Sequence, residues 1–251
     1  MRPLGFGFLE QSAALRETGH RPWPLPDAPW IMGQTWEDLL FAHWPVPPAA
    51  LRPAVPAALS LDLHKGQAWI AVTPFEVTGL RARGIAPVPG LARFAEVNVR
   101  TYVVHDGKPG IYFLSLDAAS RAAVAAARRG YRLPYFHAAM RIGRGHHDVR
   151  FASCRRNGPA AELRLRYEQG APADDELGRW LTERYCLYTL DERQQVLRAD
   201  IHHRPWSLRD ARLTLEHNTM AAPYGIELEG PPLVVHYSRR QDVVFWPLAR
   251  G

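Results

Sequence analysis

Four hydrogen-bonding side chains recur at every second position of the segment FAEVNVRTYV: Glu96, Asn98, Arg100 and Tyr102. Successive side chains of a β-strand point to opposite faces, so a strand here would place all four on one face. The other face would be β-branched and mostly apolar. A carboxylate can transfer protons, and a guanidinium can hold a carboxylate. The row is either a wet outer face or the wall of an internal cavity, and we expect the cavity wall. On such a wall it predicts either a site for an anionic ligand or a buried Glu96–Arg100 ion pair that only specifies the sheet.

Other arrangements with catalytic or metal-binding spacing are weak. The 11 histidines include the doublets His146–His147 and His202–His203, but neighbouring residues of a strand face opposite ways, and no HExxH or paired Cys/His spacing accompanies them. No GxSxG nucleophile elbow occurs, and the segments GFGFLEQ and GRG do not have the context of phosphate-binding loops. We therefore expect no metal and no cofactor, and the roles of the two doublets stay open.

Composition and charge exclude several classes of protein. The 251-residue chain has a net charge of +6, but its arginines are spread along the sequence without a basic run or an RNA-binding motif, which argues against nucleic-acid binding. No apolar run reaches the roughly 20 residues that span a bilayer, and the N-terminus has no signal-peptide pattern. The two cysteines do not make a disulfide framework. These features predict a cytoplasmic protein that does not act at a membrane.

The elements that would position the polar row are mostly strands. Alternating patterns predict strands over 59–63, 67–78, 96–104 and 111–116, and further strand-like segments follow. The clearest helix is expected over 117–129, with Asp117 as its N-cap and Gly130 at its end, packed outside the sheet. Such a sheet usually curls or closes to protect its edges. The predicted fold class is α+β, mainly antiparallel β, with two or three peripheral helices.

The sequence shows no internal repeat and no low-complexity tract that would divide it. We therefore expect a single domain over 1–251. Residues 1–29 would form an N-terminal helix and a wrap rich in proline and tryptophan, which is too aromatic for a flexible linker. Residues 30–248 would form the domain built around the sheet.

Six segments carry a family resemblance: PWIMGQTWEDLLFAHWPVPPAALRPAVPAALSLDLHKGQAWIAVTPF, FAEVNVRTYV, RGYRLPYFHA, LTERYCLYT, IHHRPW and HYSRRQDVVFWP. In them the chain resembles the YqjF-like family of uncharacterised bacterial proteins, within the acetoacetate decarboxylase-like superfamily. The resemblance covers nearly the whole chain. It implies a closed or cone-shaped antiparallel β-barrel with a pocket inside, and it places Glu96 where the superfamily carries an acidic residue at the start of a pocket strand.

The resemblance to the decarboxylase proper ends at its catalytic lysine. Those enzymes follow a Gly-Tyr turn with a lysine pair, whose first member forms a Schiff base with a keto acid. Here Gly130 and Tyr131 are followed by RLPY, and the two lysines of the chain, Lys65 and Lys108, lie in turn-like segments elsewhere. An arginine stays protonated and cannot replace the nucleophile. Schiff-base decarboxylation of acetoacetate is therefore not expected.

Candidate ligand-binding residues lie within the row and after the turn at Gly130 and Tyr131. Asn98 and Tyr102 would supply neutral hydrogen bonds to a ligand, and Tyr135 and His137 follow the turn that replaces the lysines, so they are expected to face the same cavity. The expected partner is a small molecule with an anionic group. Whether the chain forms homo-oligomers stays open.

Two functions remain for such a pocket. In the first, the protein is a lyase, hydratase or tautomerase that acts on a small keto or enol acid without a lysine. Glu96 would then move protons, and Arg100 would hold the carboxylate or enolate charge. In the second, the protein binds or senses a small anionic or aromatic metabolite without catalysis. A second acid or base within reach of the same ligand atom would favour the enzyme.

Overall fold

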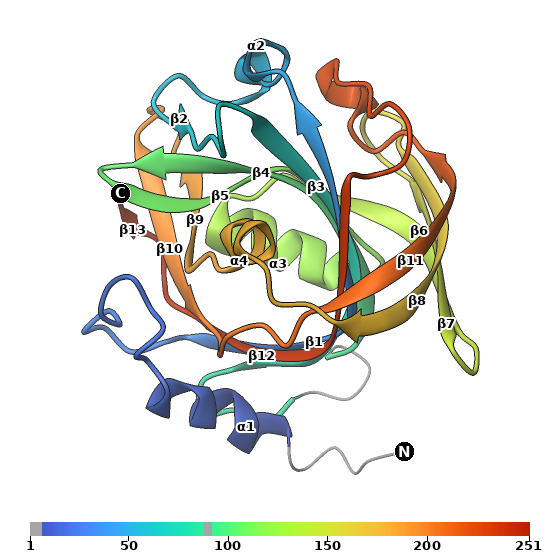
Figure 1. Cartoon of the computed structure of the whole chain (residues 1–251). Helices are drawn as coiled ribbons and strands as arrows, with labels where there is room; N and C mark the ends of the chain where they lie inside the picture. Colours follow the sequence, from blue (N-terminus) through green and yellow to red (C-terminus); the bar gives the residue numbers. More distant parts are fainter. Residues whose placement is uncertain (1–6, 88–91) are drawn as a thin grey trace.

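Thirteen strands in the described part of the chain form one continuous sheet (Figure 1). The structure is a computed structural model, and it describes residues 7–87 and 92–251. The expected domain over 1–251 therefore includes two stretches, 1–6 and 88–91, that lie outside the described residues. Strands are the main element and helices are few, which confirms the expected α+β fold class with mostly antiparallel strands.

The strands are, in chain order, β1 (Met32–Val46), β2 (Ser60–Leu61), β3 (Ala68–Ala82), β4 (Phe94–His105), β5 (Lys108–Ala118), β6 (Tyr135–Arg144), β7 (Asp148–Arg155), β8 (Glu162–Pro172), β9 (Cys186–Leu190), β10 (Val196–His202), β11 (Arg209–Asn218), β12 (Val234–Phe245) and β13 (Ala249–Arg250). The helices are α1 (Gly7–Ala13), α2 (Pro48–Leu51), α3 (Arg121–Tyr131) and α4 (Glu176–Thr182). Three short 3-10 turns also occur: η1 (Ala14–Arg16), η2 (Arg52–Ala54) and η3 (Ala222–Tyr224).

The four helices of the described chain exceed the expected two or three because the proline-rich segment after β1 forms the single turn α2. None of the helices in residues 7–87 and 92–251 is both long and apolar enough to cross a membrane.

The strand pairings close on themselves. Within the described residues, nine strands form a ring in the order β1, β3, β4, β5, β6, β7, β8, β11 and β12, and β12 pairs back with β1. A second route from β5 to β12 runs through β9 and β10. The strands β12, β1, β3, β4 and β5 therefore also belong to a smaller ring of seven. β5 pairs in parallel with β6 and β9, and its crossover to β6 contains α3, as a parallel pair requires.

The five shared strands are buried on both faces because each ring encloses side chains. On β4, the valines at 97, 99 and 103 pack into a large apolar core together with side chains of β1, β3, β7 and β8. The opposite face of β4 looks into the smaller ring and carries Glu96, Asn98 and Arg100. The alternation along this strand therefore does not mark one core face and one wet face. Both faces are interior, and only their chemistry differs.

Helix α3 begins four residues later than the sequence predicts. Its N-cap is Ser120, whose Oγ accepts a hydrogen bond from the Ala123 N–H at 3.2 Å. Asp117, the predicted cap, belongs to the end of β5, where its carboxylate forms an ion pair with Arg155 and both side chains are fully buried. An aspartate is a good N-cap, but a buried cation on β7 holds this one in the strand.

Helix α3 packs against one side of the smaller ring. One of its faces lines the cavity of that ring through Ala123, Ala127 and Tyr131. The opposite face is exposed to solvent. The small alanines bring the helix axis close to the cavity without filling it.

The segment between α1 and β1 packs against β10 and β12, as expected for an N-terminal wrap. The Trp23 indole donates to Asp200 at 3.0 Å, and Arg21 donates to the Ile201 carbonyl at 2.7 Å. Trp30 packs with Trp246 just after β12. These contacts bury one outer side of the smaller ring.

Replacing Arg155 by methionine should strongly destabilise the fold. Arg155 donates to both oxygens of Asp117 at 2.8–3.1 Å, and its removal leaves a buried carboxylate without its cation. Breaking such a pair typically costs about 3–5 kcal/mol. Urea denaturation measures the loss in free energy of unfolding. The matched control is Arg150→Met, at an exposed arginine of the same strand, which should change stability by less than about 0.5 kcal/mol. An equal loss in the free energy of unfolding of the two variants would contradict a stabilising role of the buried Asp117–Arg155 ion pair.

Candidate functional site

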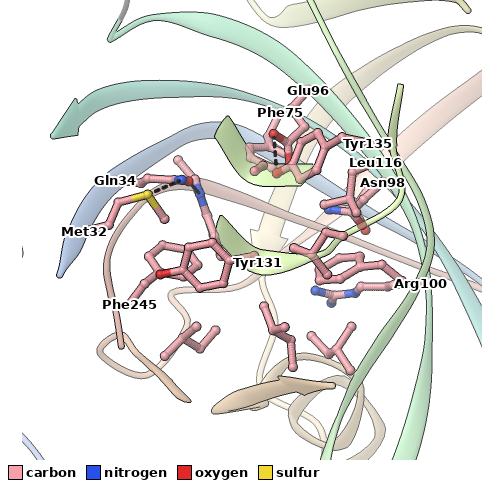
Figure 2. Close-up of a pocket in the computed structure, with 18 of the residues that line it drawn as sticks. Met32, Gln34, Phe75, Glu96, Asn98, Arg100, Leu116, Tyr131, Tyr135 and Phe245 are labelled. Carbon is pink, nitrogen blue, oxygen red and sulfur yellow. Dashed lines mark hydrogen bonds between the residues drawn. The ribbon is translucent and has the colours of Figure 1, made fainter. Parts of the chain in front are cut away.

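The smaller ring encloses a cavity of about 180 Å³ (Figure 2). All seven of its strands supply lining side chains, and α3 and the start of β6 close one side. Most of the lining is apolar or aromatic, including Phe75, Phe113, Trp206 and Phe245. Polar groups are a minority of the lining, and they come from β1, β3, β4, β6, α3, α4 and the segments that follow α4 and β10. An enclosed apolar space with a small number of directed polar groups is typical of a small-molecule site.

Three of the four residues of the predicted row line this cavity. The side chains of Glu96, Asn98 and Arg100 point into it, and each residue is only 5% exposed. Tyr102 has the same orientation on β4 but does not border the cavity. It is fully buried against Trp180, and its hydroxyl is hydrogen-bonded to His43 Nε2 at 2.8 Å. The first three residues of the row thus form part of the cavity wall, and the fourth, Tyr102, is packed among other side chains beyond it.

Glu96 forms a close pair with Tyr135, the first residue of β6. The Tyr135 hydroxyl donates to the carboxylate and lies 3.1 and 3.2 Å from its two oxygens, as the dashed lines in Figure 2 show. Burial raises the pKa of Glu96 to about 8, although the hydrogen bond from Tyr135 acts in the opposite direction and the negative charge of Asp117 adds to the rise. Burial also holds the pKa of Tyr135 well above its ordinary value. The pair therefore combines a carboxyl group that titrates near neutrality with a neutral phenol donor.

No ion pair among the described residues joins Glu96 to Arg100. A strand rises about 3.4 Å per residue, so positions four apart on one face have Cα atoms roughly 13 Å from each other. The β3–β4 pairing is regular through this stretch, and the register shift at Val99/Arg100 in the β4–β5 pairing adds its extra residue, Leu114, to β5, so β4 itself is not shortened. The alternative of a Glu96–Arg100 pair that merely specifies the sheet therefore does not apply. The two groups occupy separate parts of the cavity wall.

Arg100 is a buried cation with a spare hydrogen-bond donor. Its Nη2 donates to the Leu181 carbonyl at 3.4 Å, and its guanidinium lies over the Phe41 ring at 5.0 Å. Its Nε is buried and has no hydrogen-bond partner within the described residues. Burial lowers the pKa of Arg100 and the nearby Tyr102 phenol raises it. Since an arginine stays charged in proteins, this guanidinium is suited to bind an anionic group of a ligand.

The structure does not bring His137 to the cavity. Its backbone N–H donates to Asn157 Oδ1 at 2.8 Å, and its side chain is half-buried outside the lining. β6 pairs with β5 only from Tyr135 to His137 and continues from there beside β7, away from the smaller ring. Of the two residues expected after the turn, only Tyr135 therefore reaches the site.

Several polar residues of the lining were missed by reasoning from the sequence: Gln34, Thr73, Thr182, Arg184 and His203. Thr73 lies directly opposite Asn98 in the β3–β4 pairing, and both Thr73 Oγ1 and Asn98 Oδ1 are buried with no partner in the described part of the chain. Arg184 follows α4 and also borders the cavity. Alternation along the strand expected over 67–78 shows which residues share a face with Thr73. Its place in the site follows only once its pairing with Asn98 is known. Nothing in the local sequence marked Arg184.

Neither lysine of the chain borders the site. Both belong to the described residues: Lys65 is exposed in the turn before β3, and the Lys108 ammonium lies 5.8 Å from the centre of the Trp23 ring. The cavity therefore has no lysine amine that could form a Schiff base. No group of three or more metal-ligating side chains is found in residues 7–87 and 92–251.

Comparison with known proteins identifies relatives of the whole chain. Residues 33–242 match the model of the family DUF2071, described as an uncharacterized conserved protein. The uncharacterized protein YqjF of Bacillus subtilis is 46% identical over 230 residues, which is 90% of this chain and 95% of that protein.

Solved structures with the same fold are more distant in sequence. Acetoacetate decarboxylase from Legionella pneumophila has a TM-score of 0.64 at 13% identity over 93% of each chain. The enduracididine biosynthesis enzyme MppR has a TM-score of 0.62 at 12% identity, over 89% of this chain and 90% of that one. An acetoacetate decarboxylase-like enzyme from Sphingomonas wittichii has a TM-score of 0.59 at 16% identity, over 94% and 98%. These likenesses show that the fold is acetoacetate decarboxylase-like.

The stability of the protein should fall with rising pH because of Glu96. Its pKa is about 8 in the folded state, above the usual value of 4.5. A group whose pKa is raised on folding contributes its full stability below the unfolded pKa and loses it as the pH rises through the folded pKa. Relative to Glu96→Gln, the wild type should therefore lose on the order of 1.4 kcal/mol per pH unit between these two values. Urea denaturation at several pH values measures the difference. Glu192→Gln, at an exposed carboxylate, should give no such trend.

The protein should not form an imine that borohydride can trap with acetoacetate or pyruvate. The physical reason is that neither lysine lines the cavity of the described chain. Intact-mass analysis after reduction checks this expectation, with a Schiff-base acetoacetate decarboxylase as the positive control. A stoichiometric adduct mapped to Lys65 or Lys108 would overturn it.

Proposed function

The chain belongs to the DUF2071 family of uncharacterized conserved proteins, and we propose that its cavity is the active site of a lyase or isomerase that acts on a keto or enol acid without a Schiff base. One observation carries the proposal: the proton-active pair of Glu96 and Tyr135 faces the same cavity as Arg100, a cation for which the described residues supply no carboxylate partner. The ligand is a small molecule with an anionic group, and Arg100 binds that group.

Glu96 is the acid–base group of the proposed reaction. In the ionised form its carboxylate takes a proton from a carbon next to the carbonyl of the ligand. The electron pair of that C–H bond forms the C=C bond of an enolate, and the carboxylate becomes a carboxylic acid. The phenol of Tyr135 remains neutral because its pKa is high. Once Glu96 is protonated, the single O–H of Tyr135 turns from that carboxyl group to donate a hydrogen bond to the enolate oxygen. Return of the proton to a different atom completes a tautomerisation.

The raised pKa of Glu96 supports this role. A catalytic base works best when its pKa lies near the working pH, and burial places the pKa of this carboxyl at about 8. The fold neighbours support the class of substrate: the MppR enzyme is described in complex with pyruvate and with a condensation product of pyruvate. These observations on other proteins favour a keto acid here. They do not specify which one.

A non-catalytic binding protein is the second candidate. The observation in its favour is the largely apolar and aromatic lining, to which Trp36, Phe75 and Phe113 contribute. Such walls would hold an aromatic or aliphatic acid with Arg100 as its anchor. In that case the Glu96–Tyr135 pair would only close the polar end of the cavity.

Hydrogen–deuterium exchange separates the two candidates. Keto acids of increasing chain length are incubated with the protein in D2O, and loss of the proton next to the carbonyl is followed by NMR. The wild type should catalyse exchange for at least one acid, with a rate that rises as the pH approaches about 8, because the ionised form of Glu96 is the base. Glu96→Gln should lower the exchange rate by roughly 100-fold or more while it retains ligand binding.

The controls assign each step to its residue. Arg100→Met should abolish binding of the acid without unfolding the protein, and Tyr135→Phe should slow exchange without loss of binding. Arg240→Met, at a partly exposed arginine paired with Asp242, should change neither. Binding without exchange by the wild type would refute the enzyme and support the binding protein. Exchange that persists in Glu96→Gln would remove Glu96 from the mechanism.

A further inference from the structure

We propose that the ligand of this cavity is an elongated monocarboxylic acid whose carboxylate binds two arginines, Arg100 and Arg184, far from Glu96. The inference deepens the proposed function, and it rests on that function only for the role of Glu96 at the other end of the ligand. It excludes acids as short as pyruvate or acetoacetate, because they cannot reach both ends of the cavity.

Arg184 is held so that one nitrogen of its guanidinium is left free. Its Nε donates to the Trp180 carbonyl at 2.9 Å, and its Nη1 donates to Asp62 Oδ2 at 2.5 Å. The guanidinium also lies over the Trp180 ring at 4.4 Å. Its Nη2 is buried without a partner in the described chain, and the residue is only 3% exposed. A fixed guanidinium with one unused donor is preorganised to bind an oxygen atom.

Arg100 and Arg184 belong to the same end of the cavity. Both border it, and their guanidinium carbons lie 5.9 and 5.0 Å from the centre of one ring, that of Tyr102. Each also donates to a carbonyl of the last turn of α4, at Leu181 and Trp180. The last carbonyls of a helix lack partners within the helix and attract cations. α4 therefore holds two arginines beside each other, and the unused donors Nε of Arg100 and Nη2 of Arg184 remain for a ligand.

The charges at this end match a ligand with a single negative charge. Arg184 is neutralised by Asp62 at 2.5 Å, whereas no acidic partner of Arg100 occurs in the described residues. One positive charge is therefore left over. At the other end, Glu96 is either neutral or negative, so it would not favour a second carboxylate there. A dicarboxylate would have to place one buried charge without a counter-charge, which is costly.

The distance along β4 determines the length of the ligand. The Cα atoms of Arg100 and Glu96 are roughly 13 Å apart, and Figure 2 shows Asn98 between them. Asn98 Oδ1 and Thr73 Oγ1 are both buried without partners in the part of the chain that the structure describes. Buried polar atoms are normally hydrogen-bonded. We therefore infer that the ligand carries a hydroxyl or another hydrogen-bonding group midway between its carboxylate and the carbon that Glu96 approaches.

Isothermal titration calorimetry with a series of acids tests the inference. The probes are straight-chain monocarboxylic acids of about four to about twelve carbons, each with and without a mid-chain hydroxyl, and the dicarboxylic acids of the same lengths. Affinity should pass through a maximum at an intermediate length on the order of eight carbons, set by the span of β4. The hydroxylated acid should bind more tightly than its parent, and the dicarboxylate roughly 10-fold more weakly. Affinity that does not depend on length would overturn the inference.

Two variants test the role of Arg184 directly. Arg184→Met should weaken binding of the best monocarboxylate by roughly 10- to 100-fold, because a charge-assisted hydrogen bond is lost. Asp62→Asn keeps the arginine but removes its counter-charge, so it should shift the preference toward acids that carry two carboxylates at the same end, such as alkylmalonates. A merely structural Asp62–Arg184 pair would produce no such shift. Arg198→Met, at an arginine paired with Asp200 outside the cavity, is the matched control and should bind like the wild type.

The outcomes distinguish this inference from the proposed function. If long monocarboxylates bind in a manner that depends on Arg184 but no exchange occurs, the binding site stands and the enzyme is refuted. If exchange depends on Glu96 while Arg184→Met binds every acid normally, the enzyme stands and the two-arginine site is refuted. If Arg184→Met does not fold, the change in selectivity of Asp62→Asn still decides the question.

Discussion

The structure depends on one constraint: five strands belong to two closed rings at once, so their side chains are buried on both faces. In a sheet with one wet face, alternation separates apolar from solvated residues. In this protein, alternation separates side chains in the core of the larger ring from side chains in the cavity of the smaller ring. The valines of β4 fill the apolar core of the larger ring, and the polar residues on the other face have no bulk water to solvate them. Each polar group must therefore find a partner in the protein or in a ligand.

The chemistry of the cavity follows from that requirement. Burial without a nearby cation raises the pKa of Glu96 to about 8, and Tyr135 supplies the hydrogen bond that makes the buried carboxyl tolerable. No carboxylate among the described residues pairs with Arg100, whose guanidinium contacts the Leu181 carbonyl of α4 and the rings of Phe41 and Tyr102. Had the two groups been two residues apart, they could have approached each other. Four residues of strand keep them apart, and both remain available for a bound molecule.

The turn after α3 shows how the cavity differs from that of a Schiff-base decarboxylase. α3 ends at Tyr131, and its C-cap Arg132 adopts a left-handed conformation with a φ of 52° and pairs with the exposed Glu192 at 3.2 Å. The arginine at this turn therefore points away from the cavity. The chain next places Leu133 and Tyr135 in the lining, and Tyr135 bonds to Glu96. This turn thus delivers a phenol to the acidic residue, and the cavity in the described chain contains no lysine amine.

Local patterns were sufficient to predict part of this architecture. Alternation predicted the strands and the orientation of Glu96, Asn98 and Arg100, because the two-residue period is a property of the backbone itself. The absence of lysines from the site could also be read from the chain, which has only two. Local patterns could not predict that Asp117 pairs with Arg155, that Tyr102 lies beyond the cavity, or that β6 carries His137 away from it. They also gave no sign of Arg184. Those outcomes depend on which strands pair and on where a helix ends against them. Contacts between segments far apart in the chain decide both. The free energy of such contacts is not a property of any short segment, so a local pattern cannot reveal it.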